Sequence, residues 1–71
     1  MTPEEIQALW RENPRAVARA FAATLKDFLY PVDQDYVQAE MERLYAGGAP
    51  RGGPSMFLAR WIKGGVDCAL G

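Results

Sequence analysis

Histidine is absent from this sequence, and cysteine occurs once, as Cys68. A chain without histidine and with one cysteine cannot build an imidazole general base, a serine–histidine or cysteine–histidine nucleophile, or a zinc site of these ligands. A lone cysteine also excludes the intrachain disulfides that small secreted domains normally carry. The composition therefore predicts a protein without enzymatic activity, cofactor or metal ion, located in the cytoplasm, in which Cys68 is an inert thiol.

Long apolar runs and an excess of positive charge are also missing. No stretch approaches the roughly 20 apolar residues of a membrane span, and the N-terminus has neither the basic segment nor the apolar run of a signal peptide. Eight Lys and Arg residues stand against nine Asp and Glu residues, and the pI is about 5.2. Nucleic-acid-binding domains typically have a pI above about 9. We therefore expect neither a membrane nor a nucleic acid as partner.

The length and the apolar content predict one small helical domain over residues 1–71. Hydrophobic residues make up 49% of the chain, but many of them are alanines, which fill little core volume. A domain of about 60 residues buries only roughly 60% of the surface of its unfolded chain. The stability margin is therefore thin, and a second copy of the chain is the expected source of additional burial.

Four segments carry the signals of helix starts and stops. Thr2, Asn13 and Asp33 are N-cap residues, the first two followed directly by proline at the first helical position, and Ser55 is a fourth candidate cap. Pro31 stops the second helix because it lacks a backbone donor and restricts the residue before it. No alternating apolar segment precedes the tail. The prediction is an all-α, small orthogonal bundle with helices at about 3–12, 14–29, 34–46 and 55–63.

The loop before the last helix is the first candidate for ligand binding. Residues 47–54 contain four glycines and two prolines, a composition that holds neither helix nor strand. Glycine-rich backbone that leads into a helix N-terminus can bind an anion, and Arg51 and Ser55 would assist. No nucleotide-binding motif accompanies them. The favoured interpretation is a connector, with a weak anion site at Arg51 and Ser55 as the alternative.

A second candidate is an arginine stripe formed by Arg11, Arg15 and Arg19, which recur every four residues. Such a stripe can contact phosphates or an acidic protein. It can equally be the solvated side of a helix whose apolar face, with Phe21 and Leu25 at its centre, lies in the core. A small nucleic-acid-associated or regulatory protein that uses this stripe is the alternative function.

The leading functional prediction concerns the last helix. At about 100° per residue, its four large apolar residues span about 140°, more than the roughly 100° that a helix on the surface of a bundle needs for its core side. We expect the edge that carries Phe57 and Trp61, next to Arg60, to stay exposed and to contact a protein partner or a second copy of the chain. The competing interpretation is that the apolar tail, residues 66–70, covers this edge.

Overall fold

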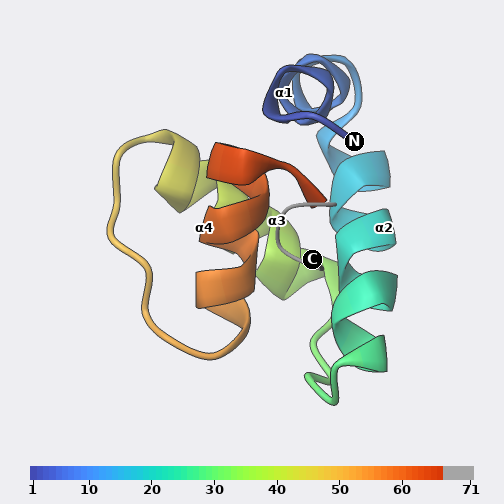
Figure 1. The fold of residues 1–71 in the computed structure, drawn as a ribbon. Helices are drawn as coiled ribbons and strands as arrows, with labels where there is room; N and C mark the ends of the chain where they lie inside the picture. The colour runs from blue at the N-terminus through green and yellow to red at the C-terminus, as the bar shows by residue number, and fades with distance from the viewer. Residues whose placement is uncertain (67–71) are drawn as a thin grey trace.

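The computed structural model describes residues 1–66 and contains four helices (Figure 1). They are α1 (Pro3–Glu12), α2 (Pro14–Asp27), α3 (Gln34–Tyr45) and α4 (Pro54–Gly64). Residues 1–66 contain no strand. The predicted small all-α bundle is confirmed, with helix boundaries within two residues of those expected. The predictions for the tail beyond Val66, including the inert thiol of Cys68, lie outside the described residues.

Local sequence explains the first three helix starts. The Thr2 hydroxyl accepts a hydrogen bond from the Glu5 amide while the Glu5 carboxylate accepts one from the Thr2 amide, so both ends of a capping box are present. The Asn13 side chain caps α2 at the Ala16 amide, and Asp33 caps α3 at the Tyr36 amide. These three predicted caps are confirmed.

The fourth predicted cap is wrong. Helix α4 starts one residue earlier than expected, with Gly53 at the N-cap, Pro54 at the first helical position, and no side-chain cap. Gly53 has a φ of 58°, which glycine adopts at little cost. Ser55 thus lies inside the first turn, fully buried, and its hydroxyl accepts a hydrogen bond from the Arg51 amide at 3.0 Å. Its role is to hold the preceding loop against the helix.

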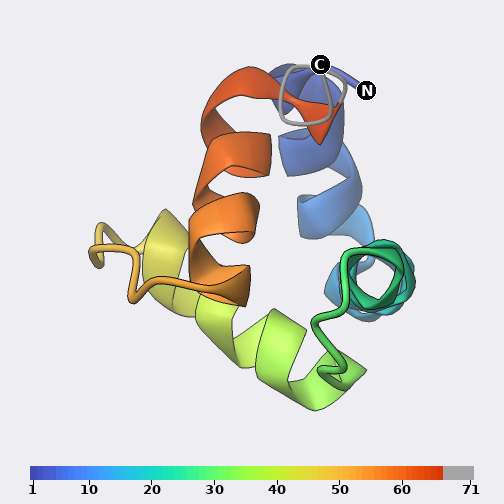
Figure 2. The ribbon, with the colours of Figure 1, turned by 60° about the horizontal axis from the view of Figure 1, so that its bottom comes forward.

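The helices cross at steep angles around one core. Figure 2 looks nearly along α2, with α3 and α4 lying across the view and α4 beside α1. The end of α4 contacts the start of the chain. The Val66 amide donates a hydrogen bond to the Met1 carbonyl, and Gly65 packs so closely on Met1 that a Cβ there would clash with the Met1 carbonyl oxygen. The start of α1 is thereby fixed to the end of α4.

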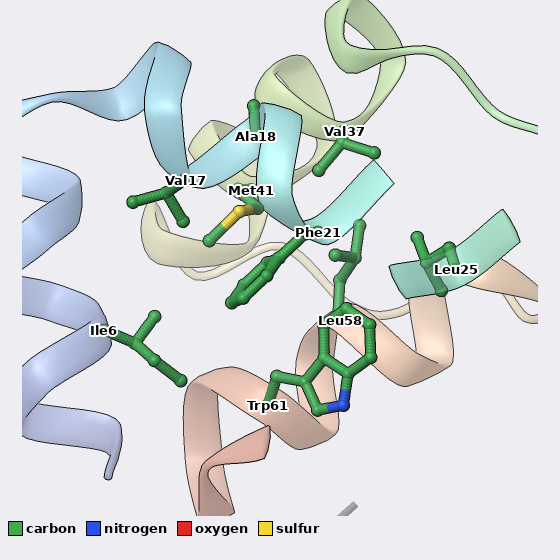
Figure 3. Close-up of a cluster of buried hydrophobic side chains, with 9 residues drawn as sticks. All are labelled: Ile6, Val17, Ala18, Phe21, Leu25, Val37, Met41, Leu58 and Trp61. Carbon is green, nitrogen blue, oxygen red and sulfur yellow. The ribbon is translucent and has the colours of Figure 1, made fainter. Parts of the chain in front are cut away.

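All four helices contribute side chains to the core (Figure 3). Its members are Ile6, Val17, Ala18, Phe21, Leu25, Val37, Met41, Leu58 and Trp61. The predicted central positions of Phe21 and Leu25 are confirmed, since both are buried. Leu9 and Phe28, which lie on apolar stripes of the sequence, are instead 43% and 37% exposed. Helical spacing gives the direction of a side chain but not whether another element covers it.

Candidate functional site

Trp61 was expected on an exposed edge, and that expectation is wrong. Its side chain is completely buried, and its ring centroid lies 4.7 Å from that of Phe21 on α2 (Figure 3). Trp61 was expected to be exposed because it lies next to Arg60 in the sequence. In the structure, the buried side of α4 includes both Leu58 and Trp61. The boundary with solvent runs between Trp61 and Phe57, one turn earlier on the same helix.

Phe57 and Arg60 do lie at that boundary. Phe57 is half-buried, and its ring centroid is 5.1 Å from that of Phe28 and 5.5 Å from that of Tyr30. The Arg60 guanidinium carbon is 5.9 Å from the centroid of the Phe57 ring, within the range of a cation–π contact. Phe28, Leu29, Tyr30 and Phe57 together form what we call the aromatic edge, where the end of α2 and the start of α4 meet.

Leu29 is the most unusual residue of the aromatic edge. Its side chain is 88% exposed, and its φ of 67° makes it the one non-glycine residue with positive φ among residues 1–66. It occupies the first position after the C-cap of α2. There the Leu29 amide donates a hydrogen bond to the Lys26 carbonyl, and the Tyr30 amide donates one to the Leu25 carbonyl. Glycine is strongly preferred at this position because a left-handed backbone crowds a Cβ.

Helix α3 ends with the same motif and supplies an internal comparison. There the Gly47 amide donates a hydrogen bond to the Leu44 carbonyl, and the Gly48 amide donates one to the Arg43 carbonyl. The residue with the left-handed backbone is Gly47, with a φ of 99°. Sequence reasoning missed Leu29. The available signal was a helix that stops before Tyr30-Pro31 with no glycine at its end.

A second surface feature is an apolar groove between α1 and α2. It has a volume of about 420 Å³. The α1–α2 groove is lined by Met1, Leu9, Ala16, Val17, Ala20 and Phe21, with Glu12 and Asn13 as its polar members. Its floor belongs to the core through Val17 and Phe21, while Leu9 and Met1 are exposed. The groove thus offers an accessible apolar surface at the end of α2 opposite to Leu29.

The predicted anion site contains a carboxylate instead. Glu40 of α3 is buried and accepts two hydrogen bonds from Arg43, at 2.7 and 3.0 Å. The Arg51 guanidinium lies 4.0 Å from the same carboxylate. The hydrogen bond from Arg43 is the main reason that the pKa of Glu40 falls from 4.5 to about 2, with smaller contributions from Ser55 and Arg51, while burial opposes the fall. Arg51 and Ser55 thus face an internal negative charge.

The arginine stripe is divided by contacts between helices. Arg15 forms an ion pair with Asp35 and a hydrogen bond to Gln38, both on α3. Arg19 reaches the Gln34 side chain at 3.4 Å. Arg11 lies on α1, where its charge opposes the increase that burial causes in the pKa of Tyr45. The structure therefore does not align the three guanidinium groups on one free face.

Two buried polar atoms, Tyr45 Oη and Trp61 Nε1, have no hydrogen-bond partner among residues 1–66. In the same part of the chain, no group of acidic, histidine or cysteine side chains could hold a metal ion. None of the helices described is long and apolar enough to cross a membrane. Comparison with protein-family models, curated proteins and solved structures finds no match for this chain.

Proposed function

We propose that this protein is a non-catalytic interaction module that self-associates through the aromatic edge. The edge includes Phe57 of α4, with Arg60 beside it, as the sequence argument expected for this helix. The buried Trp61 packs against the core side of Phe57, and the two ring centroids are 6.3 Å apart. The single cysteine favours a reducing compartment, and we propose the cytoplasm.

Leu29 is the observation that carries this proposal. A non-glycine residue in the left-handed conformation costs about 1–2 kcal/mol, and exposure of the side chain forgoes the gain of about 1.5–3 kcal/mol that burial of a leucine gives. Folding of one copy explains neither cost, since Gly47 closes α3 in the same way without them. Burial of Leu29 against a second copy recovers the apolar term. Strained residues that the fold alone does not require are typical of functional sites.

The alternative of nucleic-acid binding receives less support from the geometry. Arg15 is paired with Asp35, and Arg19 is turned toward Gln34. An aromatic edge with one adjacent arginine, Arg60, is better suited to a protein surface, because aromatic side chains and arginine are enriched at protein interfaces.

Sedimentation equilibrium of Leu29→Asn against Leu29→Met tests the proposal. Asparagine tolerates the left-handed backbone but removes the apolar side chain, whereas methionine keeps an apolar side chain with the same backbone cost. We expect self-association of the wild type and of Leu29→Met, and a dissociation constant raised roughly 10- to 100-fold in Leu29→Asn. A wild-type protein that stays monomeric at millimolar concentration contradicts the proposal, as does equal association of the two variants.

A further inference from the structure

The protruding Leu29 and the α1–α2 groove lie on one molecule but cannot meet within it. The α2 residues that line the groove run from Ala16 to Phe21, and Leu29 follows 8 to 13 positions later. At about 1.5 Å per residue this is a separation of roughly 12–20 Å along the helix. We propose that the α1–α2 groove binds Leu29 of a second copy of this chain. In the same dimer, the groove of the second copy binds Leu29 of the first. The inference rests on the proposed self-association and names the surface that accepts the aromatic edge.

The positions of the two features determine the geometry of the pair. Two α2 helices that run antiparallel bring the groove end of each beside the Leu29 end of the other. The two-fold axis then passes midway between residues 16–21 and residue 29, close to Ala23. Ala23 is exposed and, as an alanine, lets the helix axes approach closely. A closed two-fold dimer uses the same patch on both copies and does not propagate into fibres.

Charge on α2 fits the same axis. Arg19 and Asp27 each lie four residues from Ala23, about 6 Å along the helix in opposite directions. Arg19 contacts the neutral Gln34 side chain at 3.4 Å, but neither Arg19 nor Asp27 takes part in an ion pair within residues 1–66. Antiparallel pairing about Ala23 puts Arg19 of one copy at the level of Asp27 of the other, twice per dimer. Parallel pairing would instead put like charges at the same level.

Size also agrees with a second copy as the occupant. Stable interfaces bury about 800 Å² per partner, and this protein has 4355 Å² of accessible surface. The interface would therefore take nearly a fifth of the surface, most of one face of a body that measures 27 × 26 × 22 Å. The groove and Leu29 lie toward opposite ends of α2, and Ala23 lies between them in the sequence. A volume of about 420 Å³ also accommodates Leu29 with room for part of Phe28.

A complementation experiment tests the contact. Leu9→Gln makes the groove polar, and Leu29→Asn removes the protruding side chain; both side chains are exposed, so each variant should keep the circular dichroism spectrum of the wild type. Alone, each variant is expected to show a dissociation constant at least tenfold above that of the wild type. An equimolar mixture should associate more tightly than either variant alone, because the heterodimer retains one intact contact between Leu29 and a groove.

Disulfide cross-linking tests the axis. In a Cys68→Ser background, Ala23→Cys places two thiols across the proposed two-fold axis. Mild oxidation should link the copies at least ten times faster than in the control Ala39→Cys, an exposed position on α3.

The opposite set of results would be that Leu29→Asn weakens the dimer while Leu9→Gln does not, that the mixture shows no rescue, and that the two cysteine variants cross-link equally. The groove assignment then fails while self-association through the aromatic edge stands. A wild type that stays monomeric overturns both.

Discussion

Replacement of Glu40 by glutamine should reveal how much the buried carboxylate stabilises the fold. A fall in the Glu40 pKa from 4.5 to about 2 corresponds to about 3 kcal/mol at about 1.36 kcal/mol per pH unit. The partners Arg43 and Arg51 are 27% and 68% exposed, so solvent screening reduces the expected loss in Glu40→Gln to about 2 kcal/mol at pH 7. Domains of this size have roughly 4–10 kcal/mol of stability in total, which makes the loss easy to measure.

The sign of the pH dependence follows from the direction of the shift. The pKa is lower in the folded state, so the stabilisation is fully present above pH 4.5 and is lost as the pH falls toward 2. Urea denaturation followed by tryptophan fluorescence should give a gap between the wild type and Glu40→Gln that shrinks by pH 2.5 to about a quarter of its value at pH 7. Glu42→Gln, an exposed carboxylate on the same helix, is the matched control and should change stability by less than about 0.5 kcal/mol. A gap that is absent at pH 7, or unchanged at pH 2.5, would refute the reasoning.

Three further substitutions have outcomes fixed by the structure. Trp61→Ala should destabilise the monomer by about 3–5 kcal/mol, measured by thermal or urea unfolding followed by circular dichroism, because this side chain is fully buried. Gly48→Ala should cost about 1–3 kcal/mol in urea denaturation, since a Cβ would lie 2.6 Å from Arg43 Nη1 and 2.9 Å from the Arg43 carbonyl oxygen. Gly52→Ala is the converse case, because its Cβ meets open space and its cost comes only from the backbone φ of 90°. Leu29→Gly should raise the stability of the monomer by about 0.5–1 kcal/mol, because relief of the left-handed strain exceeds the added entropy of the unfolded chain. A less stable Leu29→Gly monomer would show that the left-handed leucine is not strained.

Sequence reasoning worked best where the determining interactions are local. Thr2, Asn13 and Asp33 cap helices through bonds to amides three residues away, and such spacing is visible in the chain. The stop before Pro31 is local as well, although α2 ends at Asp27 because the capping motif occupies the next residues.

The candidate site depends on contacts between distant residues and was therefore only partly predictable. The boundary with solvent between Phe57 and Trp61 depends on contacts with α2 residues more than 25 positions earlier. Trp61 packs on Phe21 and is fully buried, whereas Phe57 packs on Phe28 and is half-buried. The surroundings of Glu40 depend on Arg51, in a loop that the sequence describes only as turn-rich, and on Ser55 in the first turn of α4. The strain at Leu29 could be predicted only if the exact residue at which α2 ends were known, because that residue sets which position takes the left-handed conformation.

The unpartnered indole N–H of Trp61 gives the protein a reporter of its own unfolding. Because this proton has neither an acceptor among residues 1–66 nor access to solvent, its exchange with deuterium requires that the core open. In an NMR spectrum, the decay of this one resonance in D₂O would measure the free energy of global opening without denaturant. A dimer that forms only from folded chains lowers the opened population as concentration rises. The same exchange rate would then fall with protein concentration, and one indole signal would report both folding and self-association.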